Sequence, residues 1–330
     1  MRVLLTGGAG FIGHHFVDHV LRHTDWNITV IDRLDHSGNL NRLAEVNAVN
    51  NPRVRFVYHD LRAPLNDQVS AQIGEHAFVV HMAAGTHVDR SIVDPMSFVL
   101  DNVVATCNIL DHARKVGCAK FLYFSTDEVF GPAPAGVAYK ENDRYCSGNP
   151  YAATKAGGEE LAVSYHNTFG LPVVVTHTMN VVGERQSPEK FVPMTVAKVL
   201  SGELVLIHSD KTRTIPGSRF YIDAKDVAKA VVRLLRVGSN GQKYNIVGPK
   251  ESNNLDVATE ISAALGTPFM YQMVDFHSSR PGHDLRYALD GSKCDAIGIS
   301  PPAPDFGSIA RWYVDHAAQW LNMTQFKEVA

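Results

Sequence analysis

The segment Val3-Leu-Leu-Thr-Gly-Gly-Ala-Gly-Phe-Ile-Gly13 joins an apolar strand to a glycine-rich turn and the start of a helix. Gly7 permits the tight turn, Gly10 lets the backbone approach a pyrophosphate, and Gly13 lets the helix pack closely. The N–H groups of a first helical turn, with their partial positive charge, favour phosphate. The segment therefore predicts a dinucleotide site formed by Gly7, Gly10, Phe11, Ile12 and Gly13.

A second predicted strand ends in Asp32, at the distance from the glycines that dinucleotide-binding folds use. A carboxylate there accepts hydrogen bonds from ribose hydroxyls and repels a 2′-phosphate, so it favours NAD over NADP. The next residue, Arg33, argues in the other direction, because a neighbouring arginine could hold that phosphate. We predict NAD as the cofactor because of the carboxylate.

Short apolar runs rich in β-branched residues alternate along the chain with longer amphipathic stretches. The predicted strands are Val3–Thr6, Ile28–Asp32, Val54–His59, Phe78–Met82, Phe121–Ser125, Val173–Thr178 and Tyr244–Val247. The predicted helices are Gly13–Arg22, Ser97–Lys115, Tyr151–Phe169 and Ala224–Arg236. Strands that are apolar on both faces and alternate with helices predict an α/β fold, a doubly wound parallel sheet of Rossmann type.

Right-handed crossovers bring the carboxyl ends of such strands to one edge of the sheet, where ligands bind. Asp60-Leu61 follows the third strand and Ala83-Ala84 follows the fourth, so both pairs are predicted to line the dinucleotide groove. After about residue 179, prolines punctuate shorter elements. We expect residues 1–179 and 219–247 to form the NAD-binding domain. Residues 180–218 and 248–330 would form a smaller, mainly C-terminal, substrate-binding lobe.

The bulk composition excludes several other classes of protein. The 330 residues carry a formal net charge of −3, which gives no general attraction to nucleic acid or to an anionic membrane. No apolar run approaches the roughly 20 residues needed to cross a bilayer. The four cysteines form no C-x-x-C pair, and the 16 histidines show no metal-ligand spacing. We expect a cytoplasmic protein with no metal, no membrane association and no nucleic-acid partner.

Tyr151-Ala-Ala-Thr-Lys155 places a phenol and an ammonium four residues apart, on one face of a helix. A free tyrosine titrates near ~10 and is a poor base at neutral pH. The ammonium and a positive nicotinamide ring are expected to lower the pKa of the phenol, so that it can take a proton from a hydroxyl as hydride leaves the same carbon. Such pairs are also common on solvated helices, so this motif is not sufficient evidence alone.

Further acid–base groups follow the fifth predicted strand, in Phe124-Ser-Thr-Asp-Glu-Val-Phe-Gly131. Thr126, Asp127 and Glu128 lie at the same sheet edge, where a substrate over the nicotinamide would be reached. Adjacent carboxylates after a strand are also typical of a solvated loop or a helix start. Their convergence with the tyrosine–lysine pair favours a catalytic site.

Seven motifs occur in order along the chain: GGAGFIG, IDRLDHSGNL, HMAAGTHVDRSI, STDEVFG, NPYAATK, PEKFVP and RPGHDLRYALD. The series resembles the dTDP-glucose 4,6-dehydratase group of the extended short-chain dehydrogenase/reductase superfamily, from the N-terminus to about Lys293. GGAGFIG and Y-x-x-x-K mark only the superfamily. The adjacent Asp-Glu of STDE and the RPGHDxRY run are far more specific.

The resemblance implies that a nucleotide-linked hexose is converted into its 4-keto-6-deoxy derivative and water. Tyr151, aided by Lys155 and Thr126, would oxidise the sugar at C4 and pass hydride to NAD. Glu128 would then remove the acidified C5 proton while Asp127 protonates the departing C6 hydroxyl. The hydride would return to C6, so NAD is regenerated and stays bound. Neighbouring carboxylates can take such opposite roles because they push their pKa values apart.

The same resemblance implies which residues bind the nucleotide sugar. They are His87, Thr126 and Asn180 for the sugar, Lys190 and Phe191 for the nucleotide, Arg219 and Arg280 for the diphosphate, and His208 for the base. Arginine suits a diphosphate because its planar guanidinium donates two parallel hydrogen bonds. Surface positions for the two arginines, and a Lys190–Glu189 ion pair, are the alternatives.

Several positions depart from the usual pattern of the group. Gly85-Thr86 replaces a more common Glu-Ser, Val181 stands where a second Asn is frequent, and Lys250 stands where Asn often contacts the nucleotide. The loop 131–149 is short for thymidine-sugar dehydratases. These changes leave open whether the substrate is dTDP- or UDP-linked, and whether its hexose is glucose or an N-acetylhexosamine.

Two other functions share part of this pattern. An NDP-sugar 4-epimerase would use the glycine turn, Tyr151 and Lys155, but it needs no carboxylate pair to expel water. A non-catalytic NAD-sensing protein has no need for four acid–base groups at one sheet edge. Members of the dehydratase group usually pair through the helices predicted at Tyr151–Phe169 and Ser97–Lys115, so the resemblance also implies a homodimer.

Overall fold

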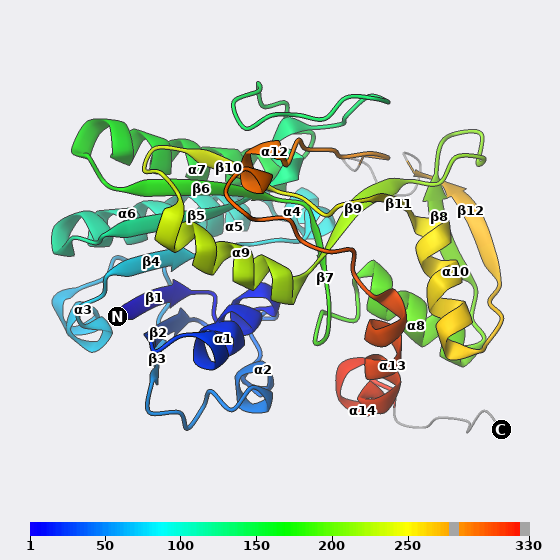
Figure 1. Cartoon of the computed structure of the whole chain (residues 1–330), viewed down its shortest axis with the longest axis horizontal. Helices are drawn as coiled ribbons and strands as arrows, with labels where there is room; N and C mark the ends of the chain where they lie inside the picture. Colours follow the sequence, from blue (N-terminus) through cyan, green and yellow to red (C-terminus); the bar gives the residue numbers. More distant parts are fainter. Residues whose placement is uncertain (277–283, 324–330) are drawn as a thin grey trace.

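The computed structural model describes residues 1–276 and 284–323. The seven predicted strands form one parallel sheet in the order β10-β6-β5-β4-β1-β2-β3 (Figure 1). They are β1 (Arg2–Thr6), β2 (Asn27–Asp32), β3 (Val54–Tyr58), β4 (Phe78–His81), β5 (Lys120–Thr126), β6 (Val173–Thr178) and β10 (Lys243–Ile246). The strand order reverses between β1 and β4, which is where an open α/β sheet binds its ligand. The predicted Rossmann-type fold is confirmed.

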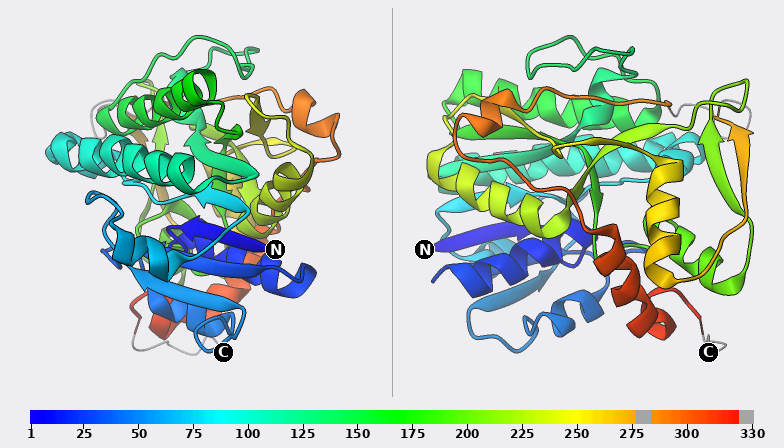
Figure 2. Two further views of the ribbon diagram at one scale, coloured as in Figure 1. Left: turned by 90° about the vertical axis from the view of Figure 1, so that its left-hand side faces the viewer. Right: turned by 45° about the vertical axis from the view of Figure 1, so that its right-hand side comes forward.

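Helices cover both faces of this sheet (Figure 2). One face carries α1 (Phe11–His23) and α9 (Ala224–Val237), and the other carries α6 (Ala105–Val116) and α7 (Pro150–Phe169). Strand side chains alternate between the two layers, so Leu5 and Val30 pack with α1 while Leu4 and Ile31 pack with α6. This two-sided burial explains the nearly continuous apolar runs in the sequence.

Shorter helices connect the strands of the main sheet. They are α2 (Leu40–Glu45), α3 (Asp67–Ile73), α4 (Val88–Val93), α5 (Pro95–Val99), the π-helical turn η1 (Leu100–Val104) and the 3₁₀ turn η2 (Asp127–Phe130). The helix predicted at Ser97–Lys115 is therefore α5, η1 and α6 in succession, with a π-helical turn in the middle.

The second lobe, on the right of Figure 1, is built from two small sheets and several helices. Its strands are β7 (Asn180–Val182), β9 (Ser218–Asp223) and β11 (Glu251–Asn253) in one sheet, and β8 (Val205–Ser209) and β12 (Tyr271–Asp275) in the other. Its helices include α8 (Phe191–Ser201), α10 (Asn254–Leu265), α13 (Phe306–Asp315) and α14 (Ala317–Trp320), while α12 (Ser292–Asp295) lies against β10. Strand β9 pairs with β7 and β11, although it was assigned to the NAD-binding domain; the domain boundaries remain a prediction.

The structure also bears on membranes, metals and thiols. No helix within residues 1–276 and 284–323 combines the length and the apolar character that a membrane span requires. The same residues contain no group of three or more His, Cys, Asp or Glu side chains that could hold a metal ion. The four cysteines are free thiols.

Helix α7 approaches β5 and η1 very closely. The Tyr123 hydroxyl donates a hydrogen bond to the carbonyl oxygen of Lys155 at 2.9 Å. A Cβ atom at Gly158 would lie 2.4 Å from the carbonyl oxygen of Asn102 and 2.5 Å from the Tyr123 hydroxyl. Glycine at position 158 therefore sets the depth of the helix that carries Tyr151.

Gly158→Ala is expected to lower the free energy of unfolding by about 1–3 kcal/mol, because the added methyl group must push α7 away from β5. Gly157→Ala is a matched control in the same helix, since its Cβ would meet only Val103, at 3.3 Å. There the alanine can gain up to about 1 kcal/mol of helix stability. Urea unfolding measures both values, and equal stability of the two variants would contradict this account of the packing.

Candidate active site

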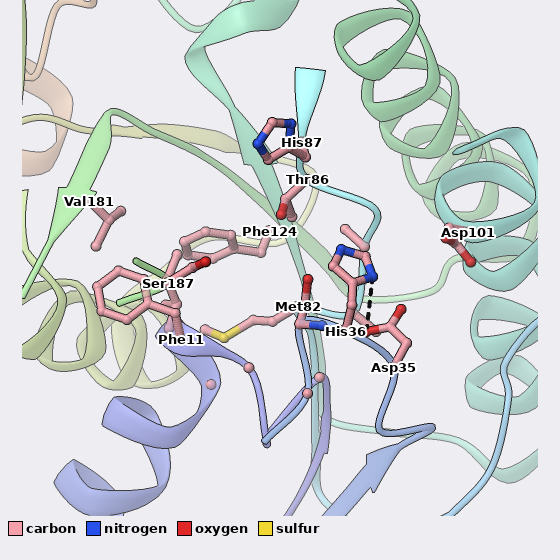
Figure 3. Close-up of a pocket in the computed structure, with 18 of the residues that line it drawn as sticks. Phe11, Asp35, His36, Met82, Thr86, His87, Asp101, Phe124, Val181 and Ser187 are labelled. Carbon is pink, nitrogen blue, oxygen red and sulfur yellow. Dashed lines mark hydrogen bonds and ion pairs between the residues drawn. The ribbon is translucent and has the colours of Figure 1, made fainter. Parts of the chain in front are cut away.

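One cavity of about 600 Å³ runs along the carboxyl edge of the main sheet (Figure 3). Its wall contains every predicted cofactor residue: Gly7, Gly10, Phe11, Ile12, Gly13, Asp32, Asp60, Leu61, Ala83, Ala84, Tyr151 and Lys155. It also contains the other predicted catalytic residues: Thr126, Asp127 and Glu128. The structure therefore brings both predicted sets of residues to one cavity.

The glycine turn at one end of the cavity fits a phosphate group. Gly7 has a φ of +75°, in the left-handed region that favours glycine, and its N–H donates to the Ile31 carbonyl at 2.8 Å. A Cβ at Gly13 would lie 2.2 Å from the Gly7 carbonyl oxygen, so α1 and the turn can touch only through backbone. The N-cap of α1 is Gly10, which has no side chain to bind the first turn, so the N–H groups there can bind an anion.

Asp32 joins this turn to the loop after β2. One carboxylate oxygen accepts from the Ala9 N–H at 3.0 Å and the other from the Leu34 N–H at 2.9 Å. Burial raises the pKa of Asp32, and the two backbone hydrogen bonds act against that rise. The carboxylate lies on the cavity wall, where it can accept from ribose hydroxyls.

The C-terminal segment also reaches the glycine turn, which the sequence did not indicate. Trp320, in α14, lines the cavity, and its ring covers the Arg42 guanidinium at 5.4 Å. Arg42 donates to the carbonyls of Ala9 at 3.2 Å, Ser37 at 2.6 Å and Arg185 at 3.0 Å. Burial lowers its pKa to about 10. Segments from both lobes are thus fastened to the cofactor end of the cavity through one buried cation.

Asp127 and Glu128 form the first turn of η2, directly after β5. Thr126 donates to Asp127 Oδ1 at 3.0 Å, while Asp127 Oδ2 is buried without a hydrogen-bond partner in the described residues. Burial raises the pKa of Asp127 to about 6, against the lowering effect of Arg219. Burial and the charge of Asp127 raise the pKa of Glu128 to about 7. Both groups can therefore gain and lose a proton near neutral pH.

The structure corrects one expectation about Tyr151. Burial raises the pKa of its phenol and the carboxylates of Glu128 and Asp127 raise it further, while a hydrogen bond with Thr126 lowers it. The Lys155 ammonium donates instead to the Phe124 carbonyl at 2.6 Å. The expected lowering by lysine is absent in this arrangement, because the ammonium is turned toward the strand.

Two residues that hold the catalytic groups were missed by the sequence analysis. Asn149 caps α7 by accepting from the Ala152 N–H at 2.8 Å, and its amide donates to Glu128 Oε2 at 3.1 Å. Ser91 accepts from the Tyr151 N–H at 3.1 Å. The Asn-Pro pair at the start of the predicted helix was a signal for the cap. Ser91 lies in the HMAAGTHVDRSI motif, but the motif gave no sign of its contact with Tyr151, which spans 60 residues.

The predicted substrate residues divide into two groups. His87, Asn180 and Lys190 line the cavity, and Figure 3 shows His87 on its wall. Phe191, His208 and Arg219 are not on that wall: Phe191 packs into two apolar clusters, and His208 lies edge-on to Phe276 in the second lobe. Arg280 lies outside the described residues.

The Arg219 guanidinium is held by backbone. It donates to the carbonyl oxygens of Ser218 at 2.7 Å, Leu285 at 2.6 Å and Asp284 at 2.6 Å, and lies over the Tyr287 ring at 4.8 Å. From there its charge still lowers the pKa of both catalytic carboxyls. Its predicted role with the diphosphate stays a prediction.

The raised pKa of Asp127 has a consequence for stability. Its pKa is 3.8 in the unfolded reference and about 6 in the fold, so the native state loses stability as pH rises from about 4 to 6. Above this range the buried charge costs about 3 kcal/mol. Asp127→Asn should therefore unfold at a higher urea concentration than the parent at pH ~8, and the difference should vanish near pH ~4. Asp25→Asn, at an exposed site, is the control; a pH-independent difference for Asp127→Asn would refute the prediction.

Comparisons with known proteins agree with this site. The family described as NAD dependent epimerase/dehydratase matches residues 3–247. The chain is 38% identical over 329 residues to a dTDP-glucose 4,6-dehydratase of Streptomyces niveus, covering 97% of this chain and 95% of the relative. It is similar to the structure of a dTDP-glucose 4,6-dehydratase from Streptomyces venezuelae with NAD and TYD bound, at a TM-score of 0.87 and 34% identity, covering 97% and 99% of the two chains.

An epimerase structure is also similar, that of the UDP-glucose 4-epimerase of Thermus thermophilus in complex with NAD. Its TM-score is 0.84 at 29% identity, covering 97% of this chain and 99% of that one. The chain belongs to the NAD dependent epimerase/dehydratase family, and within it to the NAD-binding nucleotide-sugar 4,6-dehydratases that its motifs predicted.

Proposed function

We propose that this dehydratase converts dTDP-glucose, or a similar dTDP- or UDP-linked hexose, into the 4-keto-6-deoxy sugar and water. The convergence of Asp127, Glu128 and Tyr151 on one cavity carries the proposal. An epimerase has no need of the two carboxyls, because it expels no water. The thymidine nucleotide is favoured because several relatives of this chain bear the name dTDP-glucose 4,6-dehydratase.

Tyr151 accepts the proton of the C4 hydroxyl in this proposal, and Thr126 orients the phenol through their hydrogen bond. NAD, when bound, would supply the hydride acceptor and later the hydride donor. Its positive nicotinamide ring would also lower the pKa of the Tyr151 phenol, against the rise caused by the carboxylates. Burial lowers the pKa of Lys155 to about 7. Its amine can therefore gain or lose a proton near neutral pH, four residues from Tyr151 on the same helix. His87, Asn180 and Lys190 hold the sugar and the nucleotide.

Glu128 removes the C5 proton in the second step, and Asp127 gives a proton to the leaving C6 hydroxyl. A pKa near 7 suits a general base at neutral pH, because the group is then partly ionised and still basic. Asp127 Oδ2 has no hydrogen-bond partner among the residues that the structure describes, so it can face a leaving group. Asn149 keeps the Glu128 carboxyl aimed at the cavity through a hydrogen bond of 3.1 Å.

Glu128→Gln is expected to stop water loss, with a fall in rate of about 10²–10⁴-fold, because the amide cannot remove the C5 proton. Mass spectrometry of the nucleotide sugar detects the reaction as a loss of about 18 Da, the mass of one water. A reaction in deuterated water tests the removal of the C5 proton separately. The sugar recovered from the parent should carry deuterium at C5, and the sugar recovered from the variant should not. Glu260→Gln, exposed on α10, is the control. Dehydration by Glu128→Gln at the parent rate would disprove the role of Glu128.

A panel of dTDP-, UDP-, GDP- and CDP-linked hexoses distinguishes the substrate and the reaction class. We expect the water loss with dTDP-glucose or with a UDP-linked hexose. A product of unchanged mass with inverted C4 would identify an epimerase, and no turnover with any of these compounds would leave an NAD-sensing role.

We also propose that the protein acts as a cytoplasmic homodimer formed through α6 and α7. Free thiols at all four cysteines support a reducing compartment. The two helices lie side by side on one face of the molecule in Figure 2, and their C-terminal ends expose Val116 and Phe169. Sedimentation velocity at micromolar concentration should give the mass of two chains. A single species of 36.2 kDa would contradict the dimer.

A further inference from the structure

The residue after Asp32 occupies a critical place for cofactor choice. An arginine near this acidic position can bind the 2′-phosphate that distinguishes NADP from NAD. Here the Arg33 side chain is 23% exposed and lies on the wall of the cofactor cavity. The outcome therefore depends on what the guanidinium already contacts.

The Arg33 guanidinium is already bound by carboxylates. Its two terminal nitrogens meet the two oxygens of Asp101 at 2.6 and 2.9 Å, the bidentate arrangement that arginine also offers to phosphate. Asp35 accepts from the other edge at 2.7 Å, and Asp60 lies 3.4 Å away. Burial acts to lower the pKa of Arg33, but the hydrogen bonds to Asp101 and Asp35 outweigh it and raise the pKa.

Asp101 is the carboxylate best placed to keep this arrangement. It lies in η1, between two helical segments, and its side chain is 11% exposed, against 33% for Asp35 and 43% for Asp60. It also accepts from Arg62 Nε at 2.7 Å, so that one aspartate holds two arginines. Both Asp101 and Asp35 line the cavity, and Figure 3 shows their side chains.

The charges of this cluster sum to a negative value. Two arginines face three aspartates, which leaves one negative charge, and Asp32 beside the cluster adds another. The His36 ring is a further titratable group beside the cluster, 4.0 Å from Asp35. A 2′-phosphate would therefore meet net negative charge, and it would find both bidentate edges of the Arg33 guanidinium already bound by Asp101 and Asp35.

We infer that Asp101 is a specificity-determining residue for the cofactor: by occupying Arg33 it denies NADP a cationic partner and keeps the site selective for NAD. The inference rests on the assignment of this cavity to the dinucleotide. The inference concerns the binding of the cofactor and not turnover. It can therefore fail while the proposed reaction stands, and the proposed reaction can fail while the inference stands.

Asp101→Asn tests the inference. Removing the carboxylate charge should release Arg33 for the phosphate, and a charge-assisted hydrogen bond of this kind corresponds to about tenfold or more in affinity. Titration calorimetry of the nucleotide-stripped full chain measures the Kd for NAD and for NADP. We expect the ratio of the NADP Kd to the NAD Kd to fall at least about tenfold. Asp35→Asn, at a more exposed position, should lower the same ratio by a smaller factor. This variant replaces Asp101→Asn in the test if Asp101→Asn folds poorly.

The double variant Arg33→Ala/Asp101→Asn identifies the group responsible. The double variant should return the ratio of the NADP Kd to the NAD Kd to the parent value, because the gained NADP affinity needs the freed Arg33 guanidinium. The double variant Arg62→Ala/Asp101→Asn should keep the lowered ratio. Asp111→Asn is the matched control, since Asp111 pairs with Arg114 and Lys115 on α6 and does not line the cavity. An unchanged ratio in folded Asp101→Asn, or a gain that persists without Arg33, would overturn the inference.

Discussion

The backbone of α7 lies directly against the Asn102 carbonyl of η1 and the Tyr123 hydroxyl of β5, because position 158 has no side chain, and the geometry of the active site follows from that contact. The helix carries the phenol and the ammonium, whereas the two carboxyl groups lie in η2, directly after β5. The Tyr123 hydroxyl, on β5, binds the Lys155 carbonyl oxygen and so fixes one element against the other. Asn149 repeats the connection at the start of the helix, where it caps α7 and binds Glu128. The acid–base groups are therefore positioned by two rigid elements and not by loops.

The same arrangement explains the unusual titration of these groups. Taking several ionisable side chains out of water leaves too few counter-charges for all of them, so each is displaced toward its neutral form. Asp127, Glu128 and Tyr151 move upward in pKa and Lys155 moves downward, with burial as the leading cause each time. Burying these groups lowers the stability of the fold at neutral pH, but it also gives the site groups that exchange protons readily.

The sequence was informative where a local pattern has a single structural meaning. All seven strands of the main sheet were predicted within two residues at each end, because apolar runs between helices are typical of strands buried on both faces. The rule that parallel strands end at one edge then brought Asp127 and Tyr151 together. The second lobe was predicted only as a region, because β7 and β11 have three residues each and pair with β9, which is distant from both in the sequence.

Contacts between distant segments account for what was missed in the site. Arg42 and Trp320 belong to no motif, and Ser91 lies in the HMAAGTHVDRSI motif without any sign of its partner; the roles of all three arise only when remote parts of the chain meet. Arg219 was predicted to bind the diphosphate, and this role stays a prediction; in the structure its guanidinium satisfies three backbone carbonyls of residues 218, 284 and 285. A guanidinium can bind carbonyls or phosphate, and the sequence does not say which it meets.

The contact between Trp320 and Arg42 imposes an order on biosynthesis. Strands β1 and β2 and the glycine turn leave the ribosome early, but the segment that covers Arg42 is made about 280 residues later, as the positions of the two residues require. A nascent chain can therefore form β1, β2 and the glycine turn while Arg42 still lacks its aromatic cover. The cavity wall is complete only after α14 has docked, so the site belongs to the last stage of maturation.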